Sequence, residues 1–147
     1  MELDATDQQI LECLRKDGRI SNAELAARVH RSESACHRRV RRLEQAGVIE
    51  GYSAVINQAA IGKPANIFVE VTLASTGEDT LNAFEESVRA CEDVVTCYFM
   101  TGDADYLLHI AAANTEDYER IYRTHLSRLP GIARIRSSIA LREVRRS

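Results

Sequence analysis

The hydrophobic residues between positions 21 and 47 recur at the spacing of two short helices. Ser21 and, three residues later, Glu24 form the capping-box signature of a helix start. The apolar residues that follow share one helical face: Leu25, Ala26 and Val29. A second helix is predicted to begin at Ser32 and to end at Gly47, with an inward stripe of Cys36, Val40 and Leu43. Two short helices joined by about three residues are typical of a helix-turn-helix.

A further amphipathic segment precedes this pair. Asp4 is placed to cap it, Asp17-Gly18 to end it, and its apolar face carries Ile10, Leu11 and Leu14. The three segments predict a winged or helix-turn-helix type three-helix head in residues 1–50. Residues 51–64 are predicted to be a linker, with a short strand over residues 53–56 and with Gly62 and Pro64 as breaks.

From residue 65 the hydrophobic period changes. Residues 66–75 alternate as a half-buried strand does, and residues 79–90 return to helical spacing. Two strands, 94–100 and 105–112, flank a short glycine-containing turn, and a helix and a last strand over 132–144 follow. The order β-α-β-β-α-β over residues 65–147 predicts a ferredoxin-like domain, so the fold class is α+β.

The two helices of such a domain cover only one face of its sheet. The other face is predicted to carry Phe68, Thr96, Tyr98, Leu107 and Ala111, which makes it partly apolar. An apolar sheet face is stabilised by pairing with a second copy, so we expect a homodimer.

The net charge of −3 conceals a local concentration of positive charge. Six arginines and a single acid, Glu33, lie between residues 28 and 42. An ordinary solvated helix face mixes its charges in i,i+4 pairs, whereas a one-sided cluster suits contact with phosphates. The structural alternative is a basic face that has no partner.

The exposed face of the second helix lies opposite its apolar stripe. Side chains near the N-terminus of a recognition helix reach base edges, and later side chains reach phosphates. The first group is predicted to comprise Ser34, His37 and Arg38, and the second Arg41 and Arg42; Ser32, at the start of the helix, is also predicted to contact DNA. Arg39 lies nearer the apolar stripe, so we expect it to have a structural role.

Catalytic, metal and cofactor chemistry are not indicated. The four cysteines form no C-x-x-C pair, the four histidines share no metal-ligand spacing, and no glycine-rich phosphate loop is present. We therefore expect a protein that is not an enzyme and binds neither metal nor cofactor. No apolar run has the length of a membrane span or signal segment, so a soluble, cytoplasmic protein is expected.

The turn from Thr101 to Asp105 is a candidate site for a free amino acid. A zwitterion needs hydroxyl or N–H donors for its carboxylate and an acidic acceptor for its ammonium group. Thr101 offers a hydroxyl, Gly102 allows close approach of backbone amides, and either Asp103 or Asp105 is a suitable acceptor. An acidic, solvated β-turn remains the structural alternative.

Motifs along nearly the whole chain resemble the Lrp/AsnC transcription regulators. They include Asp17-Gly18-Arg19-Ile20-Ser21-Asn22, Arg42-Leu43-Glu44, Gly47-Val48-Ile49, Gly102-Asp103-Ala104-Asp105-Tyr106 and Leu129-Pro130-Gly131. The resemblance implies a DNA-binding head, an amino-acid-sensing ferredoxin-like domain, and dimers that assemble further, commonly to octamers. It also implies an effector site between dimers that combines the hairpin, including Phe99, with the last strand at Ser138 and Ile139.

One segment departs from the family pattern. Where the family usually has Gly-Leu-Ser and then Pro, this chain has His30-Arg31-Ser32-Glu33. Arg31 in place of an apolar residue is predicted to add a charge near the phosphates. Two other functions remain open: a small ferredoxin-like enzyme or amino-acid-binding protein, and an architectural DNA-binding protein without an effector.

Overall fold

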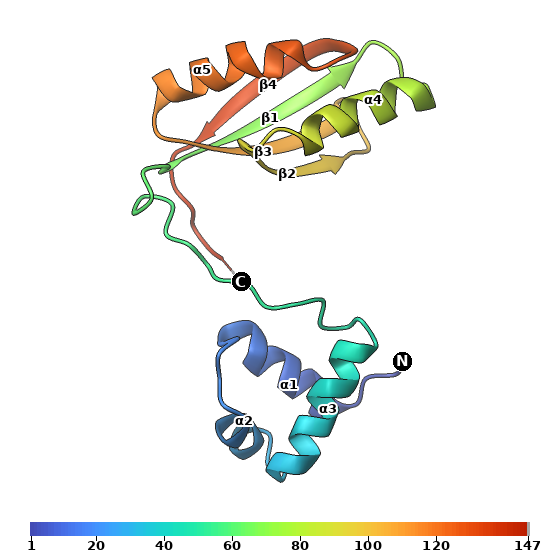
Figure 1. Cartoon of the computed structure of the whole chain (residues 1–147), viewed down its shortest axis with the longest axis vertical. Coiled ribbons are helices and arrows are strands. Elements are labelled where there is room, and N and C mark those ends of the chain that lie inside the picture. The colour runs from blue at the N-terminus through green and yellow to red at the C-terminus, as the bar shows by residue number, and fades with distance from the viewer. Residues whose placement is uncertain (147) are drawn as a thin grey trace. The chain divides into compact units, whose positions relative to one another are not determined.

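The computed structural model describes residues 1–146, which divide into two compact units (Figure 1). The head contains Met1–Val55 together with Arg145 and Arg146. The sheet unit contains Ile56–Val144. None of the helices among the described residues has the length and apolar character needed to cross a membrane.

Three helices form the head: α1 (Ala5–Lys16), α2 (Asn22–Arg28) and α3 (Glu33–Gln45). Each begins at a side-chain cap, which satisfies one of the N–H groups that a helix start leaves unpaired. Asp4 accepts from the N–H of Asp7 at 2.8 Å, and Ser21 accepts from the N–H of Glu24 at 3.1 Å. These helices confirm the predicted helix-turn-helix.

The apolar stripes of the three helices meet in one core. Its fully or almost fully buried members are Ile10, Leu25, Ala26, Val29, Cys36, Val40 and Leu43. The predicted inward stripes of α2 and α3 lie within this set. Because one stripe of α3 is buried, the opposite stripe faces solvent, and a helix that binds in a DNA groove needs such an exposed stripe.

The turn between α2 and α3 contains an unusual backbone conformation. His30 has a φ angle of 52°, and it is the sole non-glycine residue with positive φ among the residues that the structure describes. A side chain in this left-handed region costs about 1–2 kcal/mol relative to ordinary backbone. His30 therefore adopts the conformation for which glycine is the usual choice.

Residues 53–56, predicted to be a short strand, are not a strand in the structure. They are exposed, and no strand of the described chain pairs with them. A single segment without a ladder partner has nothing to hold it in a sheet, so that prediction was wrong. The head contains helices only among its described residues.

The sheet unit contains four strands and two α-helices in the predicted order: β1 (Ala65–Leu73), α4 (Glu78–Arg89), β2 (Val94–Phe99), β3 (Tyr106–Ala112), α5 (Thr115–Thr124) and β4 (Ile132–Ala140). A short 3₁₀ turn, η1 (Leu126–Arg128), joins α5 to β4. All pairings are antiparallel, and the strand order is β2-β3-β1-β4. This arrangement confirms the predicted ferredoxin-like fold.

Both α-helices of this unit cover the same face of the sheet (Figure 1). Phe84 and Val88 of α4 and Ile121 of α5 pack against alternate residues of β1 and β3, and each of these three is less than one-tenth exposed. The strand side of this core comprises Ile67, Val69, Val71, Leu73, Tyr106, Leu108, Ile110 and Ala112.

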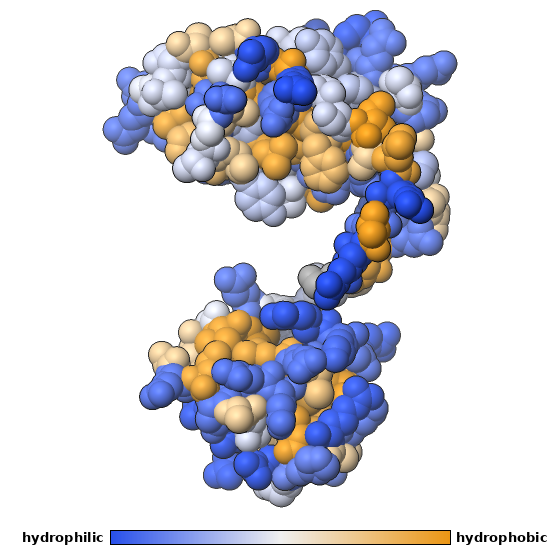
Figure 2. Space-filling model, turned by 180° about the vertical axis from the view of Figure 1, so that it is seen from behind, coloured by the Kyte–Doolittle hydropathy of each residue, from blue (hydrophilic) through white to orange (hydrophobic). Residues whose placement is uncertain are grey.

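The other face of the sheet, here called the open face, carries the intervening residues. Phe68 lies beside His109, their rings stacked with centroids 4.8 Å apart, and Tyr98 pairs with Leu107. Phe68 is 40% exposed and Tyr98 57% exposed, whereas the small side chain of Ala111 is buried. Orange apolar side chains mixed with polar ones are visible on this unit in the rear view of Figure 2.

Candidate DNA-binding and effector sites

The exposed stripe of α3 displays a set of polar side chains. Ser34, His37, Arg38 and Arg41 are all exposed. Within residues 1–146, Arg38 and Arg41 make neither an ion pair nor a hydrogen bond through their guanidinium groups. Five N–H donors on each of them therefore remain available to an external acceptor.

Ser32, also predicted to contact DNA, has a structural task at the start of α3. Its hydroxyl oxygen accepts a hydrogen bond from the N–H of Ala35 at 3.2 Å. The hydroxyl also lies 3.4 Å from that of Ser34. The cap uses the oxygen of Ser32 as an acceptor, and its role as a DNA contact stays a prediction.

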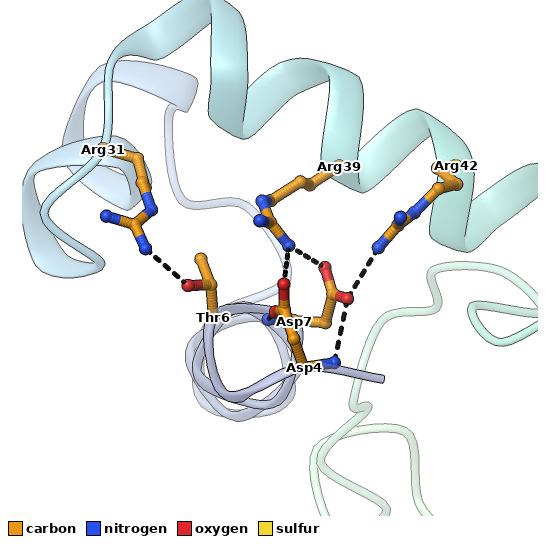
Figure 3. Close-up of polar contacts among 6 residues, drawn as sticks. All are labelled: Asp4, Thr6, Asp7, Arg31, Arg39 and Arg42. Carbon is orange, nitrogen blue, oxygen red and sulfur yellow. Dashed lines mark hydrogen bonds and ion pairs between the residues drawn. The ribbon is translucent and has the colours of Figure 1, made fainter. Parts of the chain in front are cut away.

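A buried carboxylate that the sequence analysis did not single out joins α1 to α3 (Figure 3). Asp7 has no exposed surface, and its Oδ1 accepts from Nη1 of Arg39 at 2.8 Å. Its Oδ2 accepts from Nη2 of Arg42 at 2.6 Å. Nη1 of Arg39 also donates to Asp4 at 2.7 Å, which agrees with the structural role expected for this arginine.

These contacts change the local titration behaviour. The pKa of the Asp4 carboxyl is lowered, first by the hydrogen bond from the backbone N–H of Asp7 and next by that from Arg39. The pKa of Arg39 is raised by its hydrogen bonds to Asp4 and Asp7. Both charged forms are thus favoured, so α1 and α3 are joined by an ionic cluster as well as by their apolar core.

Arg42 therefore has two possible partners. It was expected to face phosphates, and its side chain is 51% exposed, yet one nitrogen is paired with Asp7. A guanidinium has two edges, and one edge can bind a carboxylate while the other binds a phosphate. Its contact with a phosphate stays a prediction, and the hydrogen bond to Asp7 holds its guanidinium group in place.

The predicted effector hairpin lies between β2 and β3. Thr101, Gly102 and Asp103 are exposed at its tip. Gly102 has a φ of 105°, a conformation that residues with a side chain rarely adopt, so this turn requires glycine. The exposed tip offers donors and an acidic group without steric cover from the rest of the described chain.

Asp105 at the end of this hairpin is held by backbone groups. Its Oδ2 accepts from the N–H of Leu73 at 2.7 Å, and its own N–H donates to the carbonyl of Val71 at 2.9 Å. The carbonyl of Asp105 accepts from Met100 at 2.8 Å. One carboxylate oxygen is therefore engaged in the sheet, and the other has no partner in residues 1–146.

The remaining predicted effector residues lie apart from the hairpin tip. Ser138 pairs with Phe68 on the open face, whereas its neighbour Ile139 pairs with Ile67 on the helix-covered face. Phe99 lies in β2 with its ring 5.1 Å from that of Tyr106. Because β2 and β4 are the two outer strands, one chain does not bring all these residues together.

A groove of about 290 Å³ between α4 and β2 also involves Phe99. The hydroxyl of Tyr106 donates to Oε1 of Glu85 at 2.7 Å, while Arg89 pairs with Oε2 of Glu85 at 3.1 Å. Burial, together with Glu85, raises the pKa of Tyr106, and burial raises that of Cys97, so both groups are neutral near neutral pH. No cluster of three metal-ligating side chains exists in the described chain.

Comparisons with known proteins agree for both units. Residues 3–50 match a winged helix-turn-helix DNA-binding family, and residues 66–147 match the Lrp/AsnC ligand binding domain. The chain is 39% identical over 146 residues to the leucine-responsive regulatory protein of Klebsiella pneumoniae, covering 99% of this chain and 89% of that protein. The protein of the same name from Escherichia coli K12 gives the same figures.

Solved structures of regulators superpose on the whole chain. A transcriptional regulator from Neisseria meningitidis, solved as a complex with L-Met, has a TM-score of 0.94 and 32% identity, covering 99% of this chain and 94% of that one. An AsnC family regulator from Agrobacterium tumefaciens has a TM-score of 0.93 and 29% identity, with the same coverage of both chains. The chain therefore belongs to the Lrp/AsnC family of DNA-binding transcriptional regulators.

Proposed function

We propose that α3 of this regulator reads operator DNA and that a free amino acid, bound at the β2–β3 hairpin, modulates the binding. The observation that carries the proposal is the unpaired state of Arg38 and Arg41 on the exposed stripe of α3. Exposed Ser34 and His37 lie on the same stripe. Such a site needs an anionic, hydrogen-bonding partner, and the major groove of DNA supplies one.

The two ends of α3 have different tasks in this proposal. Ser34, His37 and Arg38 lie in its N-terminal half, from which base edges are reached, with Ser32 at its start. Arg41 and Arg42 lie farther along and contact phosphates. Base contacts supply sequence preference, whereas phosphate contacts supply affinity for any duplex.

Equilibrium binding of the Arg38→Ala chain to its selected operator and to random duplex tests this division. The variant is expected to lose about 1–3 kcal/mol at the operator and much less on random DNA. Arg28→Ala is the matched control, because Arg28 is paired with Glu24 at 2.6 Å on α2. Equal losses on both duplexes for Arg38→Ala would show that this side chain does not read bases.

The proposed effector is a free α-amino acid. The hydroxyl of Thr101 and backbone N–H groups near Gly102 bind its carboxylate, and the unengaged oxygen of Asp105 accepts its ammonium group. The backbone N–H of Leu73 donates to the other oxygen of Asp105 at 2.7 Å, so this side chain loses little conformational freedom when the ligand binds. The L-Met bound to the Neisseria meningitidis regulator supports this ligand class.

A thermal-shift screen with free amino acids, followed by calorimetric titration, tests the effector proposal. Asp105→Asn retains an acceptor for Leu73 and removes the charge, so effector affinity is expected to fall by about 1.5–3 kcal/mol. Asp103→Asn is the matched control at the exposed tip. Unchanged affinity in Asp105→Asn would eliminate Asp105 as the ammonium acceptor.

Assembly completes the proposed effector site. Ser138 and Ile139 lie in β4, on the opposite edge of the sheet from the hairpin. We therefore propose that they join the site from another copy of the chain. We propose homodimers through the open face and further assembly, to octamers as the family resemblance implies. The protein functions in the cytoplasm, performs no catalysis and requires no metal or cofactor. An architectural role without an effector would give no response to any amino acid.

A further inference from the structure

A groove on the head gathers positive charge from α3 and from the turn that precedes it. It is an open hollow of about 430 Å³ lined by Arg31, Ala35, Arg38, Arg39 and Arg42. The carboxylates of Asp4 and Asp7 are the acids that pair with these arginines among the described residues. Four guanidinium groups against two carboxylates leave an excess of two positive charges at one place on the surface.

The first turn of α1 holds three of these arginines in position: Arg31, Arg39 and Arg42 (Figure 3). Nη2 of Arg31 donates to Oγ1 of Thr6 at 3.1 Å, and Nη2 of Arg42 donates to Asp7 at 2.6 Å. Thr6 is only 7% exposed and Asp7 is fully buried, so both acceptors are fixed by the core of the head. These guanidinium groups are thereby oriented before any partner arrives.

The groove also retains free hydrogen-bonding capacity. Arg31 uses one of its five N–H donors, and Arg38 uses none within residues 1–146. Arg39 differs, because Asp4 and Asp7 both engage it and its side chain is only 27% exposed. The small side chain of Ala35 leaves space between the arginines. An anion with several acceptor oxygens fits this set of donors.

We propose that this groove binds a phosphodiester of the DNA backbone and that Arg31 is its ligand from outside α3. The inference rests on the proposed DNA-binding function and adds a contact from the turn before α3. Phosphate is favoured over a carboxylate ligand because Arg38 of the exposed stripe of α3 also lines the groove, and this stripe is the surface proposed above to bind the duplex. Thr6 acts as a positioning residue, since it reaches the phosphate only through Arg31.

The salt dependence of DNA binding by the full-length chain tests this assignment. Removing one phosphate contact lowers the slope of log affinity against log salt by about 0.9 for each bound head. Arg31→Gln should therefore bind DNA more weakly than the unmodified chain, and the ratio of the two dissociation constants should fall about 3.5-fold per head as salt rises from about 50 to about 200 mM. Operator and random duplex should be affected alike.

Three further variants separate a local contact from a general effect of charge. Arg31→Lys keeps the charge but loses the planar fork, so the slope should be retained with a several-fold lower affinity. Thr6→Val keeps Arg31 but removes its hydrogen bond to Thr6, so the slope should again be retained while the affinity falls. Arg28→Gln removes an equal charge outside the groove, where Glu24 neutralises it, and should leave the slope unchanged.

Two results would overturn the inference. One is an unchanged slope in Arg31→Gln, and the other is an equal fall in slope for Arg28→Gln and Arg31→Gln, which would indicate net charge alone. Thermal melting of each variant shows that the head is folded. If the unmodified chain bound no duplex at all, the proposed function itself would fail, which is distinct from loss of the Arg31 contact alone.

Discussion

Replacing Asp7 with alanine is expected to destabilise the head more than any exposed substitution. The Asp7 carboxylate accepts three hydrogen bonds: from Arg39 at 2.8 Å, from Arg42 at 2.6 Å and from the N–H of Asp4 at 3.2 Å. A hydrogen bond between charged groups contributes about 1.5–3 kcal/mol when water is excluded. Because the arginines are 27% and 51% exposed, water replaces part of each contact. We expect Asp7→Ala to cost about 3 kcal/mol in all.

Amide hydrogen exchange in the full-length chain measures this loss. A change of about 3 kcal/mol accelerates exchange of the slowest amides in α1 and α3 roughly a hundredfold. Amides of β1 and β3 serve as an internal reference, because they belong to the sheet unit. Asp7→Asn keeps one acceptor and loses the charge, so it should fall between the alanine variant and the unmodified chain.

The matched control is Glu12→Ala, also on α1. Glu12 pairs with Lys16 at 2.8 Å, but the two side chains are 66% and 71% exposed. Such surface pairs contribute little, so exchange should stay within about twofold of the unmodified chain. If Asp7→Ala changed exchange no more than Glu12→Ala does, the buried cluster would not stabilise the head and the reasoning would be refuted.

Three other predictions concern the turn and the open face. His30→Gly should stabilise the head by about 0.5–1 kcal/mol, because it relieves the φ of 52° at the cost of a more flexible unfolded chain, and the same exchange assay checks it. Burial lowers the pKa of His109, so the unfolded chain binds a proton at this residue more readily than the folded sheet unit does. The sheet unit should therefore lose stability as pH falls through the ordinary histidine range. Melting curves of His109→Gln should depend less on pH over that range. Phe68→Glu should shift the chain toward monomers in sedimentation, since it places a charge on the open face; an unchanged dimer would place the interface elsewhere.

Local sequence signals were sufficient to predict most of the fold. Asp4, Ser21 and Ser32 are caps because their side-chain oxygens satisfy orphan amides within three residues, which is a local interaction. The alternation in residues 66–73 likewise fixed which face of β1 is buried. The strand at residues 53–56 was predicted wrongly because a strand depends on a distant partner, which four residues cannot reveal.

The ionic cluster of the head was harder to predict. Asp7 reads as an ordinary acid in the first turn of a helix, where it complements the helix dipole. Its burial depends on how α3 packs across α1, which the local pattern does not contain. The sequence analysis put Arg42 on the exposed face, and its side chain is indeed 51% exposed, but so long a side chain can also reach back to a buried acid. The capping spacing of Asp4 and Asp7 was the one available signal.

The positions of β2 and β4 connect effector binding to assembly. Two strands separate them, so the hairpin and the last strand lie about 14 Å apart across one sheet at ordinary strand spacing. A free amino acid cannot contact Thr101 and Ser138 of the same chain over that distance. If both contribute to the effector site, the ligand binds an assembled state more tightly than the separated one. Linkage then requires that assembly strengthens effector binding by the same factor by which the effector favours assembly. If the effector also changes operator affinity, this linkage provides a route through assembly that needs no contact between the ligand and α3.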